Sequence, residues 1–359
     1  MNSDKLMQLR LSNQQIAETG FKTVKDIFGW MGAIQAQDYN MAKWAIGIRL
    51  PGSTDRTIEE SIAKGDIIRT HLLRPTWHLV SADDIYWMLE LTGPRIKASL
   101  RSRHRQLGLT DAIFERSNDI IEKALIGGGY LTRDELMAEL RNAKVVTDSS
   151  LLSHILMQAE LDGIICSGPV RGKKITYSLL RERVPNAKSI PRAEALSRLA
   201  RRYFTSRGPA TLQDFVWWSG LSVTDARYAV GMLGSDFVSE KMDSQTYWSP
   251  DNGESSETIE GSVYVLPAFD ELLISYKDRS AFFPFDDHGK TVSNNGMFRP
   301  FILVDGGVSG VWKRTFKKDR VVIETHFFRS LEESTNYLLE EAFAKYGHFL
   351  GRKVEIIEG

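Results

Sequence analysis

Two glutamines separated by one alanine, Gln35 and Gln37, are the first residues whose types and spacing suggest chemistry. An apolar stripe at helical spacing precedes them and consists of Val24, Ile27, Phe28 and Met31. Gln35 is the next position on that stripe, so a helix continuing from Thr23 would turn its amide toward the buried side. An unsatisfied buried amide costs about 1–3 kcal/mol, so this amide must find hydrogen-bond partners.

Gln37 would point about 200° away from Gln35 on a continuous helix. The two amides can therefore share a pocket only if the helix ends between them. The alternative is that both side chains merely satisfy the carbonyl groups of a helix end. The residues themselves leave both interpretations open.

A second group of reactive side chains falls within a predicted β-hairpin at residues 67–80. It consists of Arg69, His71, Arg74, Trp77 and His78. These side chains could line a cavity or contact phosphates. The alternative is that Trp77 is part of the core and the histidines are satisfied structural groups. We expect no metal site, because His71 and His78 lack further ligands at suitable spacing.

The elements that must position these residues repeat one pattern. It is clearest from Leu131 to Leu180, where Thr132 and Glu135 form a capping box and Asp148 can cap a second helix that Gly163 ends. Two strands then flank the basic stretch at residues 168–174, which predicts a hairpin. Helix, turn, helix and basic hairpin is the order of a winged helix, whose second helix would enter the major groove.

Similar patterns occur before and after this segment. Upstream, a helix from Thr57 ended by Gly65 precedes the 67–80 hairpin, and residues 81–84 cap a further helix. Downstream, Thr211 opens a helix that Gly220 breaks, residues 222–225 cap a second helix, and a hairpin surrounds residues 243–244. Three copies of one pattern are more specific than one.

The C-terminal third is richer in strands. Strands are predicted at residues 263–266, 301–304, 308–312 and 320–328, and a helix runs from a capping box at residues 330–333 to Gly347. The polar stretch at residues 251–260 is the predicted linker.

The predicted fold class is thus α+β, with three tandem winged-helix units followed by a C-terminal β-barrel-like domain. The predicted domains are 1–110 with the two glutamines, 111–190 with the basic wing, 191–250, and 261–359.

Charge supports a polyanion as the partner, although the net charge is zero. Residues 171–207 hold eleven Lys and Arg against two acids, and residues 95–105 form a second basic cluster. Local potential rather than net charge attracts phosphates, although such clusters can also be ordinary solvated faces. The single cysteine, Cys166, excludes an internal disulfide and fits a reducing compartment. Without a signal sequence or a long apolar run, the chain is predicted to be cytoplasmic.

Several segments in order along the chain resemble the AlkZ-like family of DNA glycosylases, in which a glutamine-X-glutamine or glutamine-X-aspartate motif is catalytic. The similar segments are Gln35-Ala36-Gln37, Arg69-Thr70-His71-Leu72, Pro75-Thr76-Trp77-His78-Leu79-Val80, Leu266-Pro267-Ala268-Phe269-Asp270-Glu271, Tyr276-Lys277-Asp278-Arg279-Ser280, Val304-Asp305-Gly306 and Gly310-Val311-Trp312-Lys313-Arg314. The resemblance implies three winged helices and a β-barrel, which agrees with the fold predicted above.

The resemblance also implies an activity, the hydrolysis of the bond between deoxyribose and an N7-alkylated purine. The alkylated base is cationic, so it leaves as a neutral molecule, and Gln35 and Gln37 would orient a water beside the oxocarbenium-like sugar. Because Gln37 stands where other members have aspartate, a narrower substrate range is implied, with bulky or cross-linking lesions at guanine N7 as the expected substrates. Asp38 is not assigned the role of base.

The implied partner is double-stranded, damaged DNA, with no cofactor, nucleotide, metal or membrane. The predicted DNA-contact residues are those of the 67–80 hairpin, together with Arg171, Lys173, Lys174, Lys277, Arg279, Lys313 and Arg314. Two alternatives remain: a non-catalytic winged-helix DNA-binding protein such as a transcriptional regulator, and a protein-interaction module. A pure binder has no need of the Gln35-Ala36-Gln37 element.

Overall fold

The computed structural model describes residues 2–145, 148–186, 188–251, 259–283, 287–293 and 296–358, and it shows a mixed α+β fold. Its residues form two compact units. The first unit is Met1–Glu59, Ser197–Trp218 and Val223–Gly359, and the second is Glu60–Leu196 with Ser219–Ser222. The four domains expected from the sequence stay a prediction, and most of the predicted linker at residues 251–260 lies outside the described residues.

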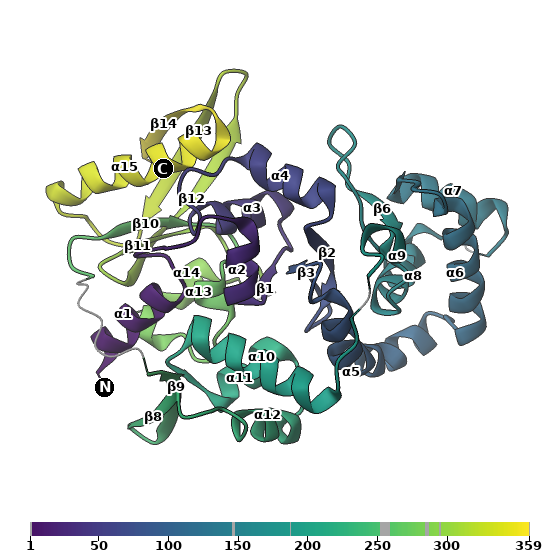
Figure 1. The fold of residues 1–359 in the computed structure, drawn as a ribbon. Helices are drawn as coiled ribbons and strands as arrows, with labels where there is room; N and C mark the ends of the chain where they lie inside the picture. The colour runs from purple at the N-terminus through teal and green to yellow at the C-terminus, as the bar shows by residue number, and fades with distance from the viewer. Residues whose placement is uncertain are drawn as a thin grey trace. The chain divides into compact units, whose positions relative to one another are not determined.

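The elements follow the chain from α1 to β14 (Figure 1). Those of the first unit, or shared at its boundaries, are α1 Ser3–Asn13, α2 Val24–Met31, β1 Ala33–Gln35, α3 Tyr39–Gly47, α4 Asp55–Lys64, α10 Arg192–Arg207, β7 Ala210–Thr211, α11 Leu212–Ser219, α12 Val223–Val230, β8 Phe237–Met242, β9 Gln245–Pro250, β10 Val263–Leu266, α13 Glu271–Ile274, η1 Ser280–Phe282, α14 His288–Thr291, β11 Phe301–Val304, β12 Gly307–Phe316, β13 Arg320–Phe327, α15 Glu333–Leu350 and β14 Lys353–Glu358. Those of the second unit are β2 Ile67–Leu72, β3 Thr76–Ser81, α5 Ile85–Gln106, α6 Asp111–Leu125, β4 Leu131–Thr132, α7 Arg133–Asn142, α8 Ser149–Leu161, β5 Ile165–Ser167, β6 Thr176–Leu179 and α9 Leu180–Arg183.

The largest sheet of the first unit is a curled half-barrel with the strand order β10-β11-β12-β13-β14. Its first four strands, which were predicted as strands, pair antiparallel, and α15 packs against the sheet. The strand β14, which the sequence reasoning did not predict, adds to β13 in parallel.

The C-terminal helix differs from the prediction at both ends. It begins at Glu333 with Glu332 as an N-cap that makes no side-chain capping bond, so the predicted capping box from Ser330 is wrong. It also continues through Gly347 to Leu350 and ends at Gly351, whose φ is 62°. A Cβ on Gly347 would lie 2.5 Å from Val354 Cγ2, so Gly347 permits close packing rather than ending the helix.

The helix that precedes the two glutamines is also shorter than predicted. Thr23 opens α2 with a capping box, but the helix ends at Met31 because Gly32 turns the chain with φ 73°. Gln35 therefore lies on the strand β1 rather than on the helix, and the predicted helical position of Gln35 is wrong.

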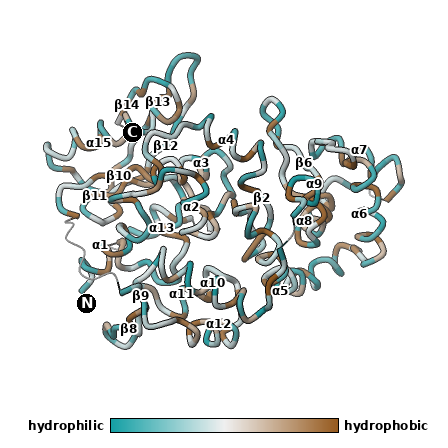
Figure 2. Tube along the Cα trace, viewed as in Figure 1, coloured by the Kyte–Doolittle hydropathy of each residue, from teal (hydrophilic) through white to brown (hydrophobic). Residues whose placement is uncertain are grey.

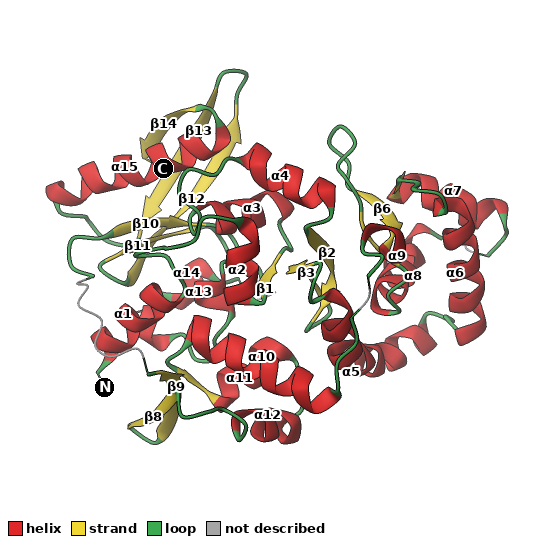
Figure 3. Ribbon diagram, viewed as in Figure 1, coloured by secondary structure: helices red, strands yellow, loops and turns green. Residues whose placement is uncertain are grey.

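The second unit is mainly helical, and its strands are short (Figure 3). The predicted capping box of Thr132 and Glu135 opens α7, and Asp148 caps α8. Hydrophobic residues run along α8 (Figure 2), which contributes Leu152, Ile155, Leu156 and Ala159 to the core of this unit. The predicted hairpins are present as β2–β3 and β5–β6.

The downstream copy also has its predicted elements, which are α11, α12 and the hairpin β8–β9 around Asp243 and Ser244. Whether each such set is a winged helix stays a prediction. Among the described residues, no helix is long and apolar enough to span a membrane.

Candidate active site

The glutamine motif lies where the chain leaves β1 and enters α3. Ala33, Ile34 and Ala36 are fully buried, and Gln35 is 6 % exposed. Gln37, in contrast, is exposed. The motif therefore joins a buried strand to the protein surface within two residues, so its second glutamine can reach a solvent molecule.

A buried carboxylate and a buried guanidinium hold the backbone of this strand. Glu271 Oε1 accepts a hydrogen bond from the Gln35 N–H at 2.8 Å. Arg207 donates to the carbonyls of Met31 at 2.7 Å and Ala33 at 2.8 Å, and it pairs with Glu271 Oε2 at 2.6 Å. Alternate residues of the segment that leads to the motif are thus fixed by one ion pair.

The Arg207–Glu271 pair is fully buried and well satisfied. Both side chains have 0 % exposure, and Glu271 Oε2 also accepts from Ser275 Oγ at 2.7 Å and Trp218 Nε1 at 3.0 Å. Burial alone would raise the pKa of Glu271, but the Arg207 charge and these hydrogen bonds outweigh burial and lower that pKa to about 2. Glu271 is therefore a permanent anion at neutral pH.

A second buried pair holds the helix that follows the motif. Arg49 binds Asp270 in a bidentate pair, with both N–O distances 2.9 Å and both side chains fully buried. Arg49 also donates to the Ala45 carbonyl in α3 at 2.8 Å. Asp270 caps α13 by accepting from the Leu272 N–H at 2.8 Å. The adjacent acids Asp270 and Glu271 therefore fix the segments on either side of the motif.

The acid next to the motif, Asp38, has a structural task. Its Oδ1 accepts from the Met41 N–H at 3.0 Å and caps α3. Arg314, predicted as a DNA contact, lies 3.8 Å from Asp38 Oδ1 and donates to Tyr346 Oη at 2.7 Å. Its side chain is 13 % exposed, so Arg314 borders the motif and a contact with DNA stays a prediction.

Two of the predicted DNA contacts in the 67–80 hairpin have partners inside the second unit. His71 Nδ1 binds Glu160, and the guanidinium of Arg69 lies 4.4 Å from the ring of Trp77. Glu160 is fully buried, and Arg69 and His71 are about 95 % buried. Their surroundings fit the structural alternative for His71, and a contact with DNA stays a prediction for both.

The remaining residues of that hairpin differ in exposure. His78 is fully buried, with Nδ1 3.0 Å from the Thr76 carbonyl, whereas Arg74 and Trp77 are half-buried. The ring of Trp77 packs against that of His71 at a tilt of 41°, with a centroid distance of 4.4 Å. Arg74 and Trp77 are thus better placed for contact than His78.

The basic hairpin tip between β5 and β6 is exposed as predicted. Lys174 pairs with Asp134 at 2.6 Å, and Arg171 pairs with Glu135, where both acids belong to the first turn of α7. Lys173 is exposed between them. Exposed pairs of this kind are weak, so phosphates can compete for these cations.

The other predicted contacts lie on the first unit. Lys277 is exposed, and Arg279 is half-buried, with its guanidinium 5.3 Å from the Trp217 ring. Lys313 is exposed and pairs with Glu324 at 2.9 Å. All three stay predictions.

The basic stretch at residues 171–207 does not act as one surface. Arg181 pairs with Glu122, Arg183 donates to carbonyls at the end of α4, and Arg207 is fully buried with Glu271. Arg207 is therefore lost from the exposed cations of this stretch and Arg183 is half-buried, whereas Arg181 stays exposed.

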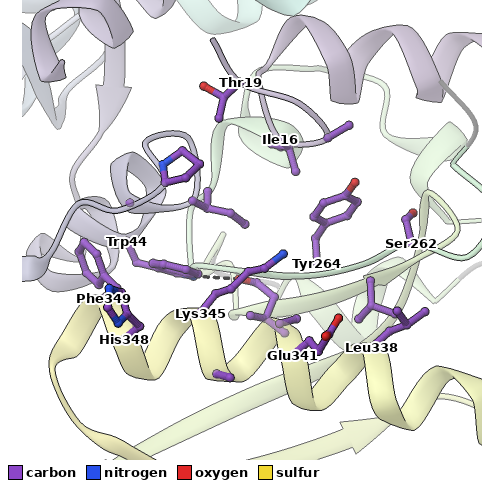
Figure 4. Close-up of a pocket in the computed structure, with 18 of the residues that line it drawn as sticks. Ile16, Thr19, Trp44, Ser262, Tyr264, Leu338, Glu341, Lys345, His348 and Phe349 are labelled. Atoms are coloured by element: carbon purple, nitrogen blue, oxygen red, sulfur yellow. Dashed lines mark hydrogen bonds between the residues drawn. The ribbon is translucent and has the colours of Figure 1, made fainter. Parts of the chain in front are cut away.

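A pocket of about 850 Å³ lies in the first unit, apart from the motif. The strand β10, the helices α3 and α15 and residues 16–19 line it, and Trp44 donates to the Val265 carbonyl at 2.8 Å on its wall (Figure 4). Neither Gln35 nor Gln37 belongs to this lining. The part of the chain described by the structure has no cluster of three or more His, Cys, Asp or Glu that could hold a metal.

The sequence reasoning missed the residues that hold the motif. Asp270 and Glu271 occur in a segment that resembles the family, but they were given no role, and Arg49 and Arg207 were not assigned to the site. A usable signal was present, because an acidic pair between apolar residues of a predicted core requires cationic partners.

Comparison with known proteins identifies the class of this protein. The sequence model for AlkZ-like DNA glycosylases matches residues 28–349. The protein is accordingly an enzyme that acts on DNA, a glycosylase, which is a hydrolase of N-glycosyl bonds. The chain belongs to the AlkZ-like family, which confirms the resemblance noted in its sequence.

A known protein and a solved structure, both from Streptomyces sahachiroi, are similar to this chain over most of its length. An interstrand DNA cross-link repair glycosylase is 24% identical over 323 residues, which cover 85% of either protein. The solved structure of the DNA glycosylase AlkZ superposes with a TM-score of 0.80 at 22% identity, and it covers 99% of this chain and 100% of the AlkZ chain. This likeness establishes the shared fold.

Proposed function

We propose that this enzyme hydrolyses the N-glycosidic bond of N7-alkylated purines in double-stranded, damaged DNA, using a water positioned by Gln35 and Gln37. The observation that carries the proposal is the motif itself, in which a fixed strand ends in a buried and then an exposed glutamine. The helix α2 ends at Met31 and β1 ends at Gln35, so the two glutamines are not on one continuous helix, which would separate them by about 200°.

The chemistry asks little of the protein beyond orientation and electrostatics. An N7-alkylated purine is cationic and departs as a neutral base, so no strong general acid is required. The amide oxygens of Gln35 and Gln37 orient the water and stabilise the positive charge that develops on the sugar. Asp38 does not serve as the base, because its carboxylate caps α3.

The surroundings of the motif support hydrolysis without strand cleavage by an amine. Lys43, in the helix that follows the motif, pairs with Asp55 at 2.9 Å and with Glu59 at 3.0 Å. Its side chain is 5 % exposed. The amine of Lys43 is thus held in two ion pairs and nearly buried, so it is not available to attack the sugar. We therefore assign a monofunctional glycosylase.

DNA is held by the helix–helix–hairpin sets, which we interpret as three winged helices followed by the barrel-like domain. The exposed tip cations Arg171, Lys173 and Lys174 contact phosphates. The relative that repairs interstrand cross-links supports bulky or cross-linking guanine N7 lesions as substrates. The buried thiol of Cys166, the sole cysteine, supports a reducing, cytoplasmic location.

Release of free base from DNA tests this function. Purified enzyme is incubated with duplex DNA containing 7-methylguanine or a guanine N7 cross-link, and the released base is quantified by mass spectrometry. We expect release by the wild type, loss of release in Gln37→Ala, and no change in Gln213→Ala, which removes another exposed glutamine of the same unit. Folded, DNA-binding protein that releases no base from either substrate would favour the non-catalytic alternative.

A further inference from the structure

We propose that Glu271 is a positioning residue for base release, acting through the backbone N–H of Gln35 with Arg207 as its counter-ion. This inference rests on the proposed function of Gln35 and Gln37. Glu271 is not a catalytic residue itself, because its carboxylate is fully buried and both of its oxygens already accept hydrogen bonds.

The two carboxylate oxygens of Glu271 have different roles: one binds buried side chains, and the other binds the backbone of the glutamine motif. Oε2 accepts from Arg207, Ser275 and Trp218, which neutralise the charge and satisfy the buried oxygen. Oε1 accepts from the Gln35 N–H at 2.8 Å. A carboxylate needed only to balance Arg207 has no reason to reach the strand that carries the motif.

Arg207 binds the same stretch of backbone through its carbonyl groups, whereas Glu271 binds it through an N–H group. Arg207 donates to the Met31 and Ala33 carbonyls, and Glu271 accepts from the next alternate residue, Gln35. Gly32 lies between the two carbonyls with φ 73°, at a turn with wide conformational freedom. The ion pair therefore restrains the backbone at a turn where Gly32 would otherwise allow several conformations.

The neighbouring acid completes the arrangement. Asp270 holds Arg49, which binds the Ala45 carbonyl of α3, the helix that begins two residues after Gln37. One dipeptide thus fixes both the strand before the motif and the helix after it. The water-orienting amides depend on this backbone, and a shift of about 1 Å in such a group can cost about 100-fold in rate.

The test distinguishes the effect of the negative charge at position 271 from the effect of the length of its side chain. Glu271→Asp keeps the negative charge for Arg207 but is one methylene shorter, so it retracts from the Gln35 N–H. Glu271→Gln keeps the length and removes the charge. Ile323→Ala, in a fully buried position of β13, is the control for loss of stability alone. Single-turnover release of 7-methylguanine at saturating enzyme is measured with the DNA Kd, below the unfolding midpoint of every variant.

We expect Glu271→Asp to lower the saturating rate about 10- to 100-fold, with the Kd changed less than about twofold. We expect Ile323→Ala to keep the wild-type rate. Glu271→Gln keeps an oxygen within reach of the Gln35 N–H, so we expect this variant, where it folds, to keep more of the saturating rate than Glu271→Asp. A folded Glu271→Asp variant with the wild-type rate, or a folded Glu271→Gln variant whose rate falls about 10- to 100-fold, would overturn the inference while leaving the proposed function intact. Wild-type release by Gln35→Ala and Gln37→Ala would instead remove the proposed function.

Discussion

The glutamine motif and the basic hairpin tip use charge in opposite ways. Near the motif, Arg207 and Glu271 form a pair with 0 % exposure for both side chains. At the hairpin tip, Lys174 and Asp134 pair at a similar distance, but their side chains are 65% and 73% exposed. A buried pair fixes the backbone beside it, since breaking it leaves an uncompensated charge, whereas an exposed pair exchanges easily with solvent or phosphate.

This difference assigns separate tasks to the two regions. The reaction requires glutamines held in one position, and buried ion pairs supply that rigidity. DNA binding requires cations that can leave one anion for another, and exposed pairs supply that exchange. Substitutions near the motif should therefore affect stability and rate, and those at the hairpin should affect affinity.

The largest effect is expected from Arg207→Ala. This change leaves Glu271 buried and unpaired and removes the bonds to the Met31 and Ala33 carbonyls, so we expect a loss of about 3–5 kcal/mol in the free energy of unfolding. Chemical denaturation measures it. Arg201→Ala is the matched control on α10, since Arg201 pairs with exposed Asp236. If both variants lose the same free energy of unfolding, buried and exposed ion pairs do not differ in the way described above.

Acid should weaken the same pair. The pKa of Glu271 lies at about 2 in the folded protein against 4.5 ordinarily, so its stabilising contribution is complete above about pH 4.5 and is lost as the pH falls toward 2. The contribution is on the order of 3 kcal/mol. We expect wild type to lose stability over this pH window more steeply than Glu271→Gln in denaturant titrations. Parallel pH profiles would show that Glu271 is not the group responsible.

The sequence predicted more of the fold than of the site. The helix start at Thr23, the capping box of Thr132 and the hairpins at 67–80 and 165–179 were visible because their signals are local. The end of α2 was missed because the apolar spacing continues past Gly32. Pairing of β14 with β13 is a long-range contact without a local signal.

In the candidate site, too, local features could be predicted from the sequence, whereas long-range contacts could not. Gln35 and Gln37 were found through their spacing and family resemblance. Arg207 was counted with a basic stretch, because a sequence cannot show which arginine is buried. Its partner Glu271 lies 64 residues away, so the pair depends on tertiary structure.

A smaller effect is expected at the hairpin tip. Lys173→Ala removes an exposed cation next to two paired ones. If Lys173 contacts one phosphate, the slope of log affinity against log salt should fall in magnitude by about 0.9, with little change in stability. Fluorescence anisotropy at several salt concentrations measures the slope. A slope identical to wild type would remove Lys173 from the interface.

The smallest effect is expected from the acids of the exposed pairs. Asp134 and Glu135 compete with phosphates for Lys174 and Arg171. Hydrogen bonds from Lys174 lower the pKa of Asp134, so this acid stays ionised at neutral pH. Asp134→Asn should therefore tighten DNA binding about twofold at low salt, and less at high salt. Weaker binding by this variant would mean that the pair orders the hairpin for contact.

Single-turnover base release at varied enzyme concentration distinguishes the role of the glutamine motif from that of the hairpin tip, because it yields the saturating rate and the DNA affinity from one experiment. On a duplex containing 7-methylguanine, we expect Gln37→Ala to abolish the saturating rate while keeping the wild-type Kd. Lys173→Ala should keep the saturating rate and raise the Kd. If Gln37→Ala releases base at the wild-type rate, the motif does not orient the reacting water, and the assignment of rate and affinity to these two regions is contradicted.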